Sequence, residues 1–254
     1  MLKFPINALL THPFPRIIKN SFIKPKLYEC LRNEFPAPSL LDENGELYNN
    51  SPKFEFFLNN SIIWKNFYHW INSPEFFRLV FELFGPYLKK FNCKIDLEKA
   101  NLINYSEPLA PKYTNCYNYW SLASLENNPN VNDLYIRFGI KEHLREYEKP
   151  IHCDLPHRLS IILIYFSNPD PQALDEGRLI LHKYNNKYAS LHKKDRHPNP
   201  AEMEVIDELS PHENFGVCFL ATNNSYHSVT PLIKNKIPRR YIYISISSKY
   251  SHIW

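Results

Sequence analysis

A histidine and an aspartate two residues apart are the first candidates for chemistry in this chain. His152 and Asp154 lie in PIHCDLPHRLSIILIYF, immediately before a strongly apolar run. Alternate residues of a strand project from one face, so an imidazole and a carboxylate can reach one point while Cys153 faces away. The pair alone is a weak signal for a metal site, because a hydrogen-bonded pair at a strand edge has the same pattern.

The rest of the candidate site follows later in the chain. His227 opens a short strand in NSYHSVTPL, and Arg239 and Arg240 open a strongly alternating run, RRYIYISISS. Two histidines and one carboxylate on one side of a metal form the facial triad of non-haem Fe(II), which leaves three coordination positions open. Those positions accommodate a bidentate 2-oxo acid and dioxygen. A guanidinium can then bind the far carboxylate of the acid through two charge-assisted hydrogen bonds.

Strand parity is the argument for choosing between the two arginines. If Arg240 points into a barrel, the three isoleucines at even positions of the run point inward with it. If Arg239 does so, the tyrosines and serines line the interior instead. An apolar interior favours Arg240, and Arg239 is the second choice.

The first hundred residues are predicted to be mostly helical. Aromatic and aliphatic residues recur at three- and four-residue spacing in 25–35 and 62–71. A third helix is expected over 74–84, with Ser73 as N-cap and with the Gly-Pro pair at 85–86 as its stop. Its wide apolar face requires a partner, and a sheet is the natural one.

From about residue 102 the pattern changes to short apolar or alternating runs separated by Asn, Pro and Asp. Strands are expected near 102–105, 114–120, 133–139, 159–167, 178–184, 203–208, 216–221, 226–230 and 239–248. Short strands in series without intervening helices favour an antiparallel sandwich or barrel over a doubly wound sheet. The segment 185–201 is expected to be a long solvated loop.

Composition predicts one intracellular domain over 1–254, with a helical part at 1–100 and a β core at 101–254. The net charge of +4 is mild and scattered, which disfavours nucleic acid as a partner. The five cysteines, at 30, 93, 116, 153 and 218, form no CxxC pair and are odd in number, as expected of reduced thiols in a cytoplasmic protein. No secretory leader and no membrane-spanning run is expected.

In its ordered motifs the sequence resembles the 2-oxoglutarate- and Fe(II)-dependent oxygenases of the prolyl 4-hydroxylase-like group, over most of its length. HPFPRIIKNSFIKPKLYECLRNEFP is similar to their opening strand and first helix, and NSPEFFRLVFELFG to a second helical stretch. PIHCD, IILIYFSNPD, EGRLILHKY, NSYHSVTPL and RRYIYISI then follow the order of a double-stranded β-helix, a jelly-roll or cupin-like barrel with helices packed on its outside.

The resemblance implies an Fe(II) site made by His152, Asp154 and His227, and a 2-oxoglutarate site at Arg240 or Arg239. It implies dioxygen as oxidant, ascorbate as an optional reductant, and hydroxylation of an unactivated C–H bond with succinate as co-product. The substrate stays open between a prolyl or other peptide side chain and a small molecule or sugar. So does the oligomeric state. A cupin-like metal barrel without 2-oxoglutarate chemistry is the alternative.

Five further residues have a weaker claim to the site. Tyr165 or Phe166 is a candidate contact for 2-oxoglutarate, and each is equally well explained as a core aromatic residue. Tyr135 and Arg137 lie on the strand before the motif, and a structural role is favoured for both over contact with the substrate. His157 is expected to be carried off the metal face, onto the surface or behind the ligands.

Overall fold

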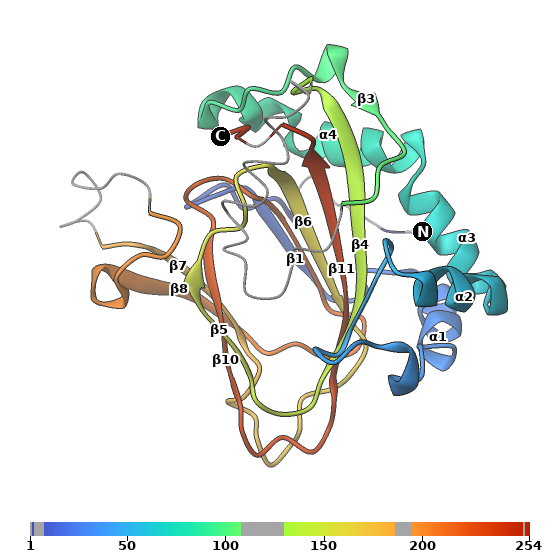
Figure 1. Ribbon diagram of the computed structural model, residues 1–254. Helices are drawn as coiled ribbons and strands as arrows, with labels where there is room; N and C mark the ends of the chain where they lie inside the picture. The colour runs from blue at the N-terminus through green and yellow to red at the C-terminus, as the bar shows by residue number, and fades with distance from the viewer. Residues whose placement is uncertain (1, 3–7, 108–129, 186–194, 251) are drawn as a thin grey trace.

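A computed structural model describes residues 2, 8–107, 130–185, 195–250 and 252–254. The strand expected at 114–120, Cys116 and the histidine at 192 lie outside these residues. Within them the chain is mainly β with α, as predicted, and its strands form two sheets (Figure 1).

The larger sheet has seven strands and is antiparallel except at one edge. Along it lie β1 (Arg16–Lys19), β9 (Gly216–Leu220), β6 (Arg158–Tyr165), β11 (Arg239–Ser248), β4 (Asp133–His143) and β2 (Glu46–Tyr48), in that order. The short strand β3 (Asn101–Leu102) pairs parallel with β4.

The smaller sheet has four antiparallel strands. Their order is β5 (Tyr147–His152), β10 (Tyr226–Leu232), β7 (Leu179–Tyr184) and β8 (Met203–Leu209). The chain alternates between the sheets: β4, β6, β9 and β11 belong to the larger one, and β5, β7, β8 and β10 to the smaller one. Among the described residues no strand of one sheet pairs through its backbone with a strand of the other, so the two sheets do not close into a continuous barrel.

An apolar cluster lies between the two sheets and shows that they face each other. Its buried members are Phe14, Ile161, Leu163, Tyr165, Leu179, Leu181, Phe215, Val217, Phe219, Ala221, Val229 and Tyr241. Because β6, β9 and β11 belong to one sheet and β7 and β10 to the other, these side chains form a shared interior. At one edge an ion pair between Arg16 and Asp207, 2.6 Å long, joins β1 of the larger sheet to β8 of the smaller.

Four helices cover the outer face of the larger sheet (Figure 1). They are α1 (Pro25–Asn33), α2 (Pro52–Asn60), α3 (Ile62–Ile71) and α4 (Pro74–Leu88). Short 3-10 turns, η2 (Pro38–Leu40), η3 (Lys89–Phe91), η4 (Leu97–Lys99) and η5 (Pro200–Glu202), lie between elements. Serine hydroxyls cap the starts of α2, α3 and α4, and Ser61 both ends α2 and caps α3 by accepting from the Trp64 N–H.

The helix-covered face explains the alternation of β11. Ile242, Ile244 and Ile246 belong to the large apolar cluster shared with the helices, whereas Tyr241 belongs to the cluster between the sheets. The most apolar face of this strand is therefore its outer one. The expectation that the isoleucines line the interior is wrong, because the helices bury the outer face as thoroughly as the second sheet buries the inner one.

Several element boundaries differ from those expected. Helix α4 runs past Gly85 and Pro86 to Leu88, because a proline so near the C-terminus removes only one backbone hydrogen bond while Leu88 is buried. Helix α2 and strand β5 were not expected. Within the described residues no helix combines the length and the apolar character needed to cross a bilayer.

Candidate metal centre

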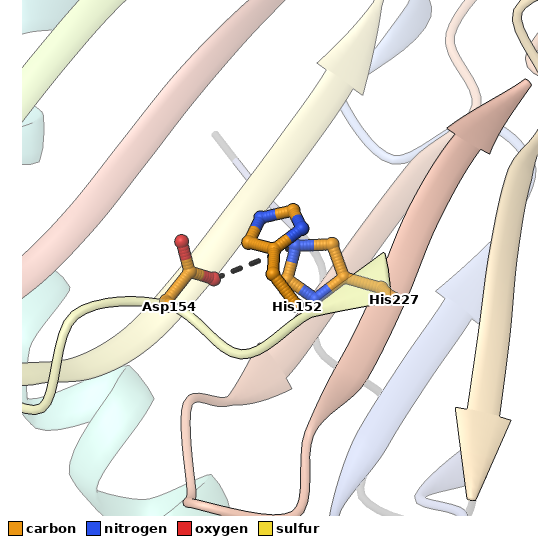
Figure 2. A group of neighbouring side chains, drawn as sticks. All are labelled: His152, Asp154 and His227. Carbon is orange, nitrogen blue, oxygen red and sulfur yellow. Dashed lines mark ion pairs between the residues drawn. The ribbon is translucent and has the colours of Figure 1, made fainter. Parts of the chain in front are cut away.

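Strand pairing brings the two histidines together. His152 is the last residue of β5, and His227 is the second residue of β10, directly opposite it in the antiparallel register. Their ring centroids are 4.3 Å apart. Figure 2 shows both imidazoles on the same side of the sheet, with Asp154 beside them.

Backbone carbonyls fix the orientation of both rings. Nδ1 of His152 lies 2.8 Å from the Pro150 oxygen, and Nδ1 of His227 lies 3.0 Å from the Ser225 oxygen. A carbonyl oxygen only accepts, so each Nδ1 is the protonated donor, and in the neutral form of the ring Nε2 carries the free lone pair. This arrangement is typical of metal-binding histidines, whose second nitrogen is held by a neighbouring group.

Asp154 completes the group from just beyond the end of β5. The expected strand geometry does not extend this far, because β5 ends at His152. The Oδ2 atom of Asp154 nevertheless lies 3.6 Å from Nε2 of His227 (Figure 2), and one ligand atom from each of the three residues lies within 4.8 Å of the others. That oxygen is buried without a hydrogen-bond partner.

The protonation states of two of these residues suit a cation. Burial and the adjacent His227 lower the pKa of His152 to about 3, so its imidazole is neutral near pH 7. Burial alone would raise the pKa of Asp154, but the two histidines reverse this effect and hold it below its ordinary value. A neutral imidazole and an ionised carboxylate are the forms that bind metals.

The donor set fits a divalent transition metal. Two imidazole nitrogens and one carboxylate oxygen are suitable ligands for Fe(II), Mn(II) or Zn(II). Mg²⁺ and Ca²⁺ prefer oxygen ligands alone and fit this set less well. An unpartnered buried carboxylate oxygen is costly unless it has a counter-charge, and a metal ion supplies one. The three residues predicted from the sequence are thus the ones that the fold brings together.

A cavity between the sheets lies beside this group. Its empty volume is about 450 Å³, part of it open to solvent. Its walls are formed by Lys141, Tyr147, Lys149, His152, Asp154, Ile161, Leu163, Leu179, His227, Val229, Arg239, Tyr241 and Tyr243.

Arg239, and not Arg240, points into this cavity. The Arg239 side chain is buried. Its Nε donates to the Gly177 oxygen at 3.0 Å and its Nη2 to the Tyr165 hydroxyl at 3.0 Å, while Nη1 is buried without a partner. The guanidinium also lies over the Tyr241 ring at 4.6 Å. The Nη1 amino group of a rigidly held guanidinium is therefore available to an anion.

Arg240 lies on the opposite face of β11. Its Nε pairs with Glu142 at 2.6 Å, and the guanidinium lies over the Phe35 ring on the helix side of the sheet. The first choice of the parity argument, Arg240 as the inward residue, is wrong, and the second choice has the inward position.

Of the other candidate residues, Tyr165 lies beside the cavity residue Arg239, whereas Phe166 and His157 lie outside the site. Tyr165 contacts the cavity arginine, as described, whereas Phe166 belongs to the outer core and stacks on Tyr28 with centroids 5.0 Å apart. His157 is buried and is not part of the metal-ligand group, so the surface alternative for it is wrong.

Tyr135 and Arg137 bind an internal carboxylate. The Tyr135 hydroxyl donates to Glu107 at 2.9 Å, and Arg137 pairs with the same carboxylate at 2.9 Å. Arg158 adds a two-pronged contact, its Nη2 donating to Oε1 at 2.6 Å and its Nη1 to Oε2. Glu107 is 2% exposed, and these partners hold its pKa well below the ordinary value against the raising effect of burial.

Sequence reasoning missed four residues of this interior: Tyr147, Tyr241, Lys149 and Glu107. Tyr147 and Tyr241 share a hydrogen bond of 3.1 Å between their hydroxyls beside Arg239. Tyr241 could have been found by placing Arg239 inward, since it shares that face of the strand. The other residues carry no sequence signal of this kind, because β5 has a mixed polar pattern and Glu107 lies outside any strand, between β3 and β4.

Comparison with known proteins gives structural neighbours only. No family sequence profile matches the chain, and no curated protein matches it in sequence. A prolyl 4-hydroxylase from Phytophthora capsici is similar at 10% identity, with a TM-score of 0.46 over 92% of this chain and 58% of its own length. A prolyl-4-hydroxylase from Pseudomonas putida aligns at 14% identity and a TM-score of 0.30, over 55% of this chain and 69% of that one.

A third neighbour is a 2OG-Fe(II) oxygenase family oxidoreductase from Burkholderia pseudomallei. It aligns at 16% identity and a TM-score of 0.29, over 47% of each chain. The solved structures similar to this chain include prolyl 4-hydroxylases and a 2OG-Fe(II) oxygenase family oxidoreductase. These superpositions are partial, so it is the side chains of the site that indicate what the protein can do.

Proposed function

We propose that this protein is an Fe(II)- and 2-oxoglutarate-dependent oxygenase that hydroxylates an unactivated C–H bond. The observation that carries the proposal is the pairing of two features in one cavity. One is the His152, Asp154 and His227 group with its unpartnered carboxylate oxygen, and the other is the buried Arg239 with its unpartnered N–H. The strand order supports a double-stranded β-helix as the scaffold, since successive core strands from β4 to β11 alternate between the two sheets except for the β7–β8 hairpin.

In this proposal the three ligands hold Fe(II) from one side. When bound there, Fe(II) supplies the activation of dioxygen that couples decarboxylation of 2-oxoglutarate to oxidation of the substrate. The chain itself orients the imidazoles through the Pro150 and Ser225 carbonyls and keeps Asp154 ionised.

Arg239 is proposed to bind the far carboxylate of 2-oxoglutarate. Two of its three nitrogens are fixed by Gly177 and Tyr165, so the guanidinium is held in place before the anion arrives. The hydroxyls of Tyr147 and Tyr241 lie beside it and add further donors. Such preorganised, charge-assisted contacts are worth more in a desolvated cavity than in water.

The remaining walls are proposed to exclude water around the reacting atoms. Ile161, Leu163, Leu179 and Val229 line the cavity with aliphatic surface, and all are buried. The unpartnered N–H of Arg239 argues against a cupin-like metal site without a 2-oxo acid, because that chemistry gives no use to a buried guanidinium in this place.

The direct test is anaerobic addition of Fe(II) followed by 2-oxoglutarate to the purified protein. We expect a visible metal-to-ligand charge-transfer band that requires both additions, and succinate formation when oxygen is admitted. The absence of the band from folded protein would contradict the proposal. A band that forms without any dependence on Arg239 would leave Fe(II) binding intact and overturn the assignment of the co-substrate site.

A further inference from the structure

Lys149 differs from the other cations of the cavity in having no hydrogen-bond or ion-pair partner in the part of the chain that the structure describes. It lies on β5 opposite Val229 of β10, which places it on the face that lines the cavity. The residue is exposed, so it stands at the open side of the cavity. Among the described residues no hydrogen bond or ion pair involves its ammonium group.

The other cationic side chains of the cavity, Lys141 and Arg239, already have partners. The ammonium of Lys141 is buried, pairs with Glu46 and lies over the rings of Tyr48 and Tyr243, at 5.0 and 5.5 Å. Arg239 is held by Gly177 and Tyr165, with one N–H left over. A dianionic co-substrate on Arg239 uses that N–H and leaves Lys149 unchanged.

The charge balance of the cavity favours one more anion. A metal dication and a 2-oxoglutarate dianion cancel each other, and Glu46 offsets Lys141. Asp154 is the single acidic residue among the cavity walls, against both Arg239 and Lys149. One positive charge is therefore in excess at the open side of the cavity, where it would attract an anionic group of a bound molecule.

We infer that Lys149 binds a carboxylate of the primary substrate, so that the substrate class is an acid rather than a neutral molecule. The inference rests on the proposed function, because it assigns 2-oxoglutarate to Arg239. Lys149, at the open side of the cavity, lies in the same sheet as His152 and His227, farther inside. A substrate whose carboxylate binds Lys149 would therefore extend toward the metal ligands. Tyr243 also lines the cavity and offers an aromatic face for the body of that substrate.

The test uses full-length protein loaded with Mn(II) and saturating 2-oxoglutarate, which binds without turnover. The probes are N-acetyl amino acids and the corresponding primary amides, and the readout is paramagnetic broadening of the probe protons by the bound Mn(II). We expect the acids to be broadened at concentrations about tenfold or more below those of the amides, since a charge-assisted hydrogen bond is worth about that factor.

The variants separate a specific contact from a general charge effect. Lys149→Gln should abolish the preference for acids, and Lys149→Arg should retain it. Lys90→Gln, which removes a charge of another exposed lysine in η3, should behave as the wild type. Under oxygen with Fe(II), the preferred acids should also raise succinate formation in the wild type.

Three results would overturn the inference. The first is equal binding of acids and amides to the wild type, and the second is an unchanged preference in Lys149→Gln. The third is a loss of 2-oxoglutarate affinity in Lys149→Gln, which would assign this lysine to the co-substrate instead. Failure of the protein to bind 2-oxoglutarate at all would contradict the proposed function itself, and the inference with it.

Discussion

His152 and Asp154 allow the most direct test at the level of single residues. Replacing either by Ala removes one of three metal donors, and we expect loss of both Fe(II) retention and succinate formation. The measurements are metal content after gel filtration and succinate yield under oxygen. His197→Ala is the matched control, because this exposed histidine lies 6.3 Å from the His152 ring, centroid to centroid, without being a ligand. Unchanged turnover in either ligand variant would refute the ligand assignment.

The two arginines give a second test with a built-in control. Arg239→Lys keeps the charge but loses the planar fork, so we expect KM for 2-oxoglutarate to rise about 10- to 100-fold while Fe(II) binding is retained. Arg240→Lys alters a half-exposed ion pair with Glu142 and should change stability by less than about 1 kcal/mol and KM very little. The reverse pattern would contradict the side-chain directions described above.

The site residues differ in how far the sequence predicts them. The HxD spacing and the later histidine are readable because a metal constrains residue type as well as position. The direction of the Arg239 side chain cannot be predicted in this way. The residue types of β11 alternate regularly, and both faces of the strand are buried. Parity alone therefore cannot tell which face meets the helices.

At the scale of elements, Glu107 joins the segment before the β core to strands β4 and β6. We expect Glu107→Gln to lower the free energy of unfolding by about 3–5 kcal/mol, because Arg137 and Arg158 are left buried without a counter-charge. Urea denaturation at pH 7 measures this loss. Glu29→Gln, at an exposed position in α1, is the control and should lie within about 0.5 kcal/mol of the wild type.

The same carboxylate gives a pH dependence with a defined sign. Its pKa in the folded protein lies well below the ordinary 4.5, so its contribution to stability is fully present above about pH 4.5. It is lost as the pH falls through the folded value. The wild type should therefore lose stability more steeply than Glu107→Gln below pH 4.5, and parallel curves would contradict this account.

Element prediction succeeds where local pattern and tertiary environment agree. Helix α3 has the predicted bounds, because its apolar spacing and the Ser61 cap indicate the same start. Strand β5 escapes prediction, since YEKPIH contains exposed charges and a proline and is held by pairing with β10 alone. Pro86 shows the opposite error, in which a local stop signal is overridden by burial of Leu88.

For the whole molecule, the proposed site predicts a stability that depends on two ligands bound in a fixed order. The candidate metal ligands His152 and His227 belong to the smaller sheet, and Asp154 follows its strand β5. Arg239 belongs to the larger sheet. We expect Mn(II) at about 100 times its Kd to raise Tm by about 5 °C or more. Added 2-oxoglutarate should raise it further only when Mn(II) is present, because it then links both sheets.

Thermal denaturation of two variants separates these steps. Asp154→Ala should lose the rise in Tm caused by Mn(II) and the further rise caused by 2-oxoglutarate. Arg239→Lys should keep the rise caused by Mn(II) and lose most of the rise caused by 2-oxoglutarate. Stabilisation by 2-oxoglutarate in the absence of metal would contradict the proposed order of binding.

The pairing of β5 with β10 also has a consequence for how the protein would acquire the proposed metal ion. The two imidazoles belong to strands that are distant along the chain and become neighbours only when β10 docks against β5. A ribosome must therefore release nearly all of the β core before a complete set of three donors exists. Iron loading would then be a late event of biogenesis, and nascent chains stalled before Tyr226 should hold no more metal than the Asp154→Ala variant.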